Sequence, residues 1–262
     1  MPGLAGSIIE LRGAKLHLRR AGTGEPLLFL HGVQGLPEST AALDRLSRRF
    51  TVLAPDHPGF GASDSPDRVQ DVADLALFYL DFLEALDLKS VHLIGHSLGG
   101  WIALELAIRS SARVTSLTLA ATAGIRVAGV PRGDMFIASP AELTRLLFAD
   151  EGAGAQWFAS WQATPGLMAA YDRNRAAAAK YTWQPRLYDP KLEHWLHRVG
   201  VPTHIVWGEA DSLIPPAHAA ALGKLVPGAA TTLLPGCGHM LDIERPDLFA
   251  ETVLRFIEGL RS

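Results

Sequence analysis

The chain has 262 residues, of which 48% are hydrophobic and 19% charged, a composition typical of a globular protein and unlike that of a disordered chain. Its 24 basic and 27 acidic residues are spread along the whole length and give a formal net charge of −3, which argues against nucleic acid or an acidic membrane surface as partner. A single cysteine, Cys237, excludes an internal disulfide, and the sequence carries no signal-peptide pattern or bilayer-spanning apolar run, so we expect a cytoplasmic protein.

Short apolar runs alternate with amphipathic stretches in the first third of the chain. Residues 7–10 and 15–20 are expected to form an antiparallel pair, and residues 27–30 and 50–54 read as central strands buried on both faces. Apolar positions recur at helical spacing over residues 69–86, with acidic residues between them. This order predicts an α/β fold with a mostly parallel sheet and helices on both faces.

The same alternation continues along the chain and resumes near its end. We expect a strand at residues 91–94, a helix at 98–108 and a strand at 114–119. Two more strands are predicted at residues 203–207 and 231–234, and an amphipathic helix closes the chain.

The strand pattern is interrupted between residues 125 and 195, where aromatic residues are frequent. Helix-favouring stretches at residues 141–148 and 167–180 indicate that this segment is an inserted helical cap. The expected organisation is a core domain formed by residues 1–124 and 196–262, with the cap, or lid, at residues 125–195.

The strongest chemical signal is a G-x-S-x-G turn centred on Ser97, between a predicted strand and a predicted helix. Small neighbours are needed there because the serine lies in a strained turn where strand and helix pack closely. The alternative is a glycine-rich capped turn with an incidental serine, but the strand–turn–helix context favours a nucleophile.

A serine hydroxyl attacks a carbonyl only when a base takes its proton, so a histidine and a carboxylate are expected later in the chain. His239 and Asp211 each follow one of the last two predicted strands. The carboxyl ends of parallel strands share one edge of a sheet, which would bring both residues to Ser97. Glu209 and Asp242 are rival carboxylates, and Asp211 could instead cap the following helix.

Acyl transfer also needs backbone N–H groups that bind the oxyanion of the tetrahedral intermediate. One donor is expected from Leu98, directly after the nucleophile. The second is expected from Val33, with Gln34 as the alternative, in the loop that opens with His31 and Gly32.

The aromatic cap suggests that the substrate carries an apolar acyl or alcohol group. The alternative is that these aromatic side chains form the core of the cap itself. The residues expected to border the substrate are His31, Gly32, His96, Trp157, Trp161, Trp183 and Met240. We expect no metal and no organic cofactor, because the histidines are scattered and no metal or phosphate motif occurs.

With these residues placed, the chain resembles the α/β-hydrolase superfamily along nearly its full length. The supporting motifs are His31-Gly32, the turn Asp56-His57-Pro58-Gly59-Phe60-Gly61-Ala62-Ser63, the turn at Ser97, the segment Gly208-Glu209-Ala210-Asp211 and the pair Gly238-His239. The resemblance implies the α/β-hydrolase fold, an eight-stranded, mostly parallel sheet flanked by helices with an inserted cap. Within the superfamily it resembles the capped single-domain branch. This branch holds esterases, C–C bond hydrolases of the meta-cleavage type, cofactor-free haloperoxidases or perhydrolases, epoxide hydrolases and haloalkane dehalogenases.

The nucleophile narrows the predicted function. Epoxide hydrolases and haloalkane dehalogenases of this branch carry aspartate where this chain has Ser97, and C–C bond hydrolases often carry an aromatic residue where it has Met240. We therefore expect a serine esterase acting on a small, largely apolar substrate, as a monomer or homodimer. The alternatives are C–C bond hydrolysis, perhydrolysis and, in another class, a ligand receptor.

Overall fold

The computed structural model describes residues 4–36, 41–164 and 166–261. The prediction that the chain has no signal peptide relied in part on residues 1–3, which lie outside the described residues. The strands form one eight-stranded sheet in the order β1-β2-β4-β3-β5-β6-β7-β8. They are β1 (Ala5–Leu11), β2 (Ala14–Ala21), β3 (Glu25–Leu30), β4 (Phe50–Pro55), β5 (Val91–His96), β6 (Val114–Ala120), β7 (Thr203–Gly208) and β8 (Ala230–Leu234).

The sheet is mostly parallel, which confirms the predicted fold class. β1 and β2 pair antiparallel, with Ser7 opposite Leu18, and β2 pairs antiparallel with β4. From β4 across to β8, neighbouring strands run parallel. The central strands are buried along almost their whole length because helices cover both faces, which explains their continuous apolar sequences.

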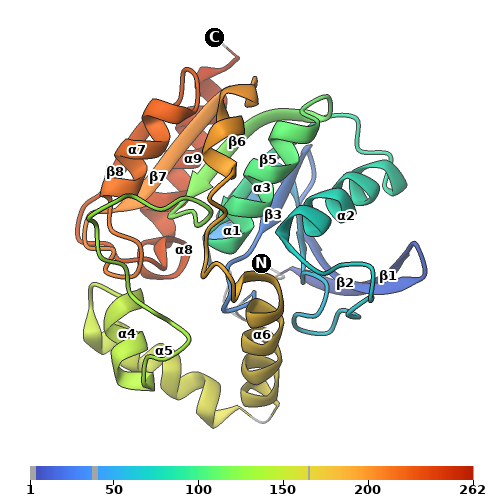
Figure 1. Cartoon of the computed structure of the whole chain (residues 1–262). Coiled ribbons are helices and arrows are strands. Elements are labelled where there is room, and N and C mark those ends of the chain that lie inside the picture. Colours follow the sequence, from blue (N-terminus) through green and yellow to red (C-terminus); the bar gives the residue numbers. More distant parts are fainter. Residues whose placement is uncertain (1–3, 37–40, 165, 262) are drawn as a thin grey trace.

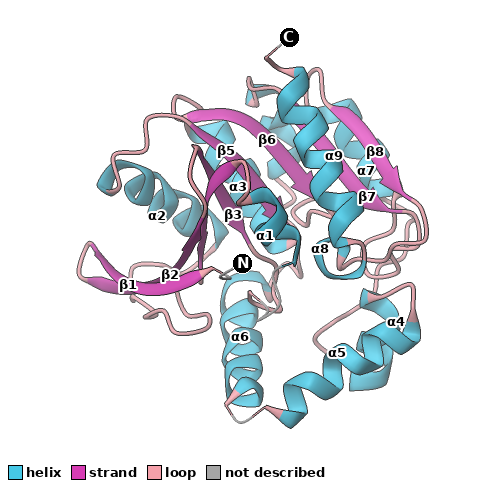
Figure 2. Ribbon diagram, turned by 180° about the vertical axis from the view of Figure 1, so that it is seen from behind, coloured by secondary structure: helices cyan, strands magenta, loops and turns pink. Residues whose placement is uncertain are grey.

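The helices lie on both faces of the sheet, as Figures 1 and 2 show from opposite sides. On one face α2 (Val72–Ala85) packs against α3 (Leu98–Arg109), which also contacts the 3-10 helix η1 (Leu192–Arg198), itself next to α7 (Ala217–Leu225). On the other face α1 (Ala41–Leu46) packs against α9 (Pro246–Gly259) and α8 (Leu241–Glu244). Within the described residues, no helix combines the length and apolar character needed to cross a membrane.

Three helices between β6 and η1 lie together at one end of the molecule (Figure 1): α4 (Pro140–Leu147), α5 (Glu151–Ala163) and α6 (Leu167–Thr182). They fall within residues 125–195, where the cap was expected. α4 begins at a capping box in which Ser139 and Glu142 satisfy each other's backbone N–H groups. α5 was not among the predicted helical stretches because Gly152 and Gly154 lower the helix propensity of its first turns.

Candidate active site

The turn after β5 holds Ser97 in a strained backbone conformation, with φ 53° and ψ −113°. Glycines on both sides make this turn possible. A Cβ atom at Gly99 would lie 2.0 Å from the carbonyl oxygen of Leu30, and one at Gly95 would lie 2.4 Å from that of Gly99. The two glycines therefore allow α3 to start directly against β5 and β3, which presents the serine at the N-terminus of a helix.

Ser97, His239 and Asp211 converge at the carboxyl ends of the parallel strands. His239 Nε2 lies 2.9 Å from Ser97 Oγ, and His239 Nδ1 lies 2.8 Å from Asp211 Oδ2. All three residues are buried, at 2%, 1% and 3% exposure. In this arrangement the imidazole can accept the proton of the hydroxyl while the carboxylate fixes its tautomer and orientation.

Asp211 also closes a local turn, but it does not cap the following helix, α7, whose N-cap residue is Pro216. Its second oxygen, Oδ1, accepts the backbone N–H groups of Leu213 at 3.0 Å and Ile214 at 2.8 Å. The two roles use different oxygens, so the local turn itself holds the carboxylate toward the histidine. The rival Glu209 is exposed.

Val33 and Gln34 line the same small cavity as Ser97, which Leu98 follows directly in the chain. Among the residues that the structure describes, no protein acceptor takes the backbone N–H of Val33, Gln34 or Leu98. Leu98 opens α3, whose first N–H groups are unpaired by helix geometry. Val33 and Gln34 lie in a turn closed by the hydrogen bond from Gly35 N to Gly32 O.

His96 connects the nucleophile turn to the loop of the catalytic histidine. Its Nε2 donates to the carbonyl oxygen of His239 at 2.9 Å. Burial lowers the pKa of His96, which keeps the ring neutral and its hydrogen bond intact near neutral pH. His96 thus positions His239 relative to Ser97.

A buried pair of histidines, His31 and His57, supports the loop that carries Val33 and Gln34. His57 N donates to His31 Nε2 at 3.1 Å, and His57 Nε2 donates to the His31 carbonyl at 2.9 Å. The remaining ring nitrogen, His57 Nδ1, lies 2.5 Å from the hydroxyl of Tyr79 and accepts a hydrogen bond from it. Burial lowers the pKa of His57 to about 4 and that of His31 well below its usual range. The sequence singled out His31 in the His31-Gly32 motif and His57 in the Asp56–Ser63 motif, but no pattern indicated that the two side chains contact each other.

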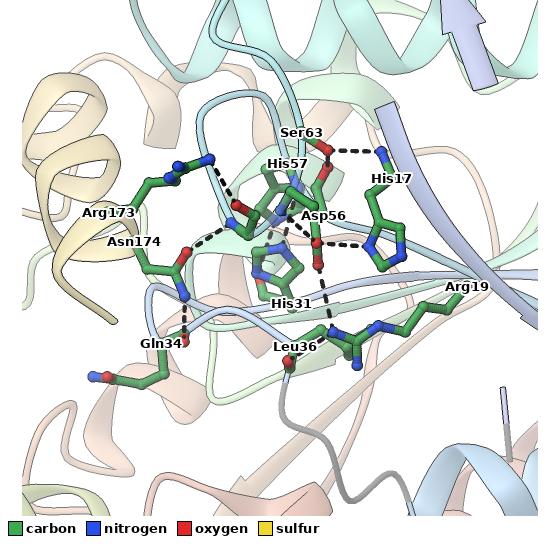
Figure 3. A network of polar contacts seen from close by, with 12 residues as sticks. His17, Arg19, His31, Gln34, Leu36, Asp56, His57, Ser63, Arg173 and Asn174 are labelled. Carbon is green, nitrogen blue, oxygen red and sulfur yellow. Dashed lines mark hydrogen bonds and ion pairs between the residues drawn. The ribbon is translucent and has the colours of Figure 1, made fainter. Parts of the chain in front are cut away.

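Helices α4 and α6 contact the two loops that carry His239 and Gln34. The carbonyl of Leu147, the last residue of α4, accepts the N–H groups of His239 at 2.8 Å and Met240 at 3.1 Å. From α6, Asn174 Nδ2 donates to Gln34 O at 2.9 Å, and Asn174 Oδ1 accepts from Gly61 N at 2.9 Å (Figure 3).

A small cavity beside Ser97 encloses about 10 Å³, room for about one water molecule. Four of the residues expected to border the substrate line it, and Leu147 and Asp242 also take part. These four are His31, Gly32, His96 and Met240.

The three tryptophans expected near the substrate lie elsewhere. Trp157 and Trp161 pack against each other at 5.5 Å between ring centroids, and Trp161 also contacts Tyr171 inside the cap. Trp183 is 48% exposed and carries the guanidinium of Arg186 over its ring. In the described part of the chain, no group of three or more His, Cys, Asp or Glu side chains is arranged to hold a metal ion.

Comparison with known proteins places this geometry among hydrolases. The chain matches the model of the Alpha/beta hydrolase family over residues 27–252. It is 30% identical to a 2-hydroxymuconate semialdehyde hydrolase of Pseudomonas sp. (strain CF600), over 96% of this chain and 93% of the relative.

Solved structures share the fold. A bacterial membrane phospholipase A superposes with a TM-score of 0.84 at 24% identity, covering 99% of this chain and 87% of that one. A naproxen esterase from Bacillus subtilis superposes with a TM-score of 0.77 at 20% identity, covering 98% and 92%.

Proposed function

Because this chain belongs to the Alpha/beta hydrolase family, we propose that it hydrolyses carboxylic esters through an acyl-enzyme formed on Ser97. The observation that carries the proposal is the chain of two short contacts from Ser97 Oγ through His239 to Asp211. A pure binding protein gives no physical reason to keep hydroxyl, imidazole and carboxylate aligned in this way.

The proposed reaction uses each of these groups in turn. His239 Nε2 takes the proton of Ser97 as the serine oxygen attacks the ester carbonyl, and Asp211 stabilises the resulting imidazolium. The N–H groups of Val33 and Leu98 bind the oxyanion, each worth about 3 kcal/mol of barrier lowering. The imidazolium then gives its proton to the leaving alcohol. A water molecule, deprotonated by His239, attacks the acyl-enzyme and releases the carboxylic acid, which restores the serine hydroxyl.

Hydrolysis of a C–C bond is the second candidate, and the relative from Pseudomonas sp. favours it. The cavity argues for the ester instead. The name of that relative's substrate, a muconate, implies a carboxylate, whereas none of the 12 described residues that line the cavity is Lys or Arg, and one of them is Asp242. A substrate carboxylate there would meet a like charge without a cation to balance it.

Activity-based labelling tests the proposal. A fluorophosphonate probe should modify Ser97 in the wild-type protein, as located by mass mapping, and should leave Ser97→Ala unmodified. The exposed Ser212→Ala variant is the matched control and should label like the wild type. A p-nitrophenyl ester series of increasing acyl length, run beside a dienoate substrate, then separates ester from C–C hydrolysis. A wild-type protein that binds ligands but resists the probe would be a receptor.

A further inference from the structure

Two polar side chains beside Ser97 have no hydrogen-bond partner. Gln34 is only 3% exposed, yet neither Nε2 nor Oε1 of its side-chain amide contacts a partner among the described residues. The Oδ1 atom of Asp242 is buried and unpartnered in the same way. Both residues line the small cavity that also contains Ser97 and His239. Both residues therefore border the place where the proposed reaction occurs.

The backbone of Gln34 is fixed by the cap, but its side chain is not engaged there. Its carbonyl accepts from Asn174, whereas Figure 3 shows the side-chain amide extending away from that contact and from the His31–His57 pair. Buried polar groups in folded proteins are almost always paired, and leaving one unpaired destabilises the fold. Methionine would fill the same volume without this cost. The amide is accordingly explained by a partner that is present only when substrate is bound.

The chemistry of the two groups defines what that partner must offer. The Gln34 side chain has both a donor and an acceptor, while the Asp242 carboxylate has acceptors only. A hydroxyl or an amide N–H can donate to these acceptors, and a hydroxyl can also accept from the amide of Gln34. A plain alkyl chain satisfies none of them, and a carboxylate would be repelled by Asp242.

We propose that Gln34 and Asp242 form a specificity subsite for a hydrogen-bond donor, most simply a hydroxyl, carried by the substrate close to the scissile carbonyl. This inference rests on the proposed esterase function and narrows its substrate class to hydroxylated or amide-bearing esters. Gln34 follows Val33, an expected oxyanion donor, and Asp242 lies three residues after His239. The substrate donor therefore lies within a few bonds of the carbonyl carbon.

A matched pair of esters tests the subsite. p-Nitrophenyl 3-hydroxybutyrate and p-nitrophenyl 3-methylbutyrate differ only in a hydroxyl that replaces a methyl group of the same size. After each rate is divided by its uncatalysed rate, the wild-type kcat/KM should favour the hydroxy ester by about tenfold or more, because a methyl group leaves the buried polar groups unpaired. Gln34→Met and Asp242→Leu should each bring this ratio close to one.

The variants and controls separate specificity from stability. Gln34→Met should not lower the melting temperature, because the side chain loses no hydrogen bond to the protein and keeps about the same volume. A clear decrease would instead indicate a structural role and overturn the proposal. Replacing an exposed carboxylate on the neighbouring loop, Glu209→Gln, should leave the ester ratio at its wild-type value.

The outcome also distinguishes failure of the subsite from failure of the esterase function. If Ser97 does not react with the fluorophosphonate probe and p-nitrophenyl acetate is not cleaved, the esterase function itself is wrong. If both reactions occur but the ester ratio is near one in the wild type, or is unchanged in both variants, water alone satisfies Gln34 and Asp242 and the subsite is refuted.

Discussion

The buried His57 makes the fold sensitive to acid, and the size of this effect follows from its surroundings. His57 has no exposed surface, and its ring nitrogens already bind the His31 carbonyl and the Tyr79 hydroxyl. Burial disfavours the charged ring and lowers the pKa from 6.5 to about 4. The unfolded chain therefore takes up the proton near pH 6.5, while the folded chain resists it until about pH 4. The stabilising contribution is complete above pH 6.5 and is lost as the pH falls toward 4.

One pKa unit corresponds to about 1.4 kcal/mol, so the fall from 6.5 to about 4 is worth about 3 kcal/mol in total. Most of this loss, about 2 to 3 kcal/mol, falls between pH 7.5 and pH 4.5. Glutamine can donate to the His31 carbonyl but does not titrate in this range. His57→Gln is therefore expected to have a lower free energy of unfolding at pH 7.5 and a shallower decline with acid.

Urea unfolding followed by tryptophan fluorescence at the two pH values measures this difference. Between pH 7.5 and pH 4.5, the free energy of unfolding of the wild type should fall by about 2 to 3 kcal/mol more than that of His57→Gln. The exposed His194→Gln variant is the control and should keep the wild-type difference, although other buried histidines contribute to acid unfolding in all three proteins. Parallel pH curves for the wild type and His57→Gln would refute the reasoning.

Three further substitutions test the catalytic site and its support. Asp211→Asn should lower kcat by about 10³- to 10⁴-fold with little change in KM, because the amide no longer fixes the tautomer of His239. Steady-state kinetics with an ester measure this effect, and a loss below tenfold would contradict the role assigned to Asp211. Asn174→Leu should lower the free energy of unfolding by about 2 kcal/mol in urea, since two buried hydrogen bonds between cap and core are lost; an unchanged midpoint would show that the cap is held by packing alone. Gly99→Ala should lower the free energy of unfolding by about 3 kcal/mol or more, because its Cβ would lie 2.0 Å from the Leu30 carbonyl oxygen. Gly259→Ala, with open space around it, is the control and should leave the free energy of unfolding unchanged. Equal melting temperatures of the two variants would be inconsistent with this packing.

The sequence predicted the parts of the site that depend on chain topology. Ser97, Asp211 and His239 each follow a strand, and in a parallel sheet those ends share one edge, so local pattern and topology were sufficient to nominate them. The continuous apolar runs of β3 and β5 identified buried central strands for the same reason.

What the sequence did not predict depends on side-chain directions and on contacts between layers. The contacts among His31, His57 and Tyr79 join three elements far apart in the chain, and no spacing rule connects them. No sequence pattern singled out Asn174, yet its amide contacts two loops of the sheet domain, at Gln34 and Gly61. Trp183 faces solvent and stacks with Arg186 instead of bordering the cavity, and helical periodicity did not predict this side-chain direction.

Helices α4 and α6 are hydrogen-bonded to the loops that carry His239 and Gln34, so substrate entry involves both loops. The cavity beside Ser97 holds about 10 Å³, whereas pockets that bind small organic ligands have volumes of several hundred Å³. Leu147 and Met240, which line the cavity, must therefore shift when an ester binds. The carbonyl of Leu147 accepts the N–H of His239, so this shift reaches the backbone of the catalytic histidine directly. On the opposite side Asn174 holds the Gln34 loop to α6. In the proposed mechanism, a shift of α4 and α6 would therefore act on His239 and on the loop of Val33 and Gln34 together.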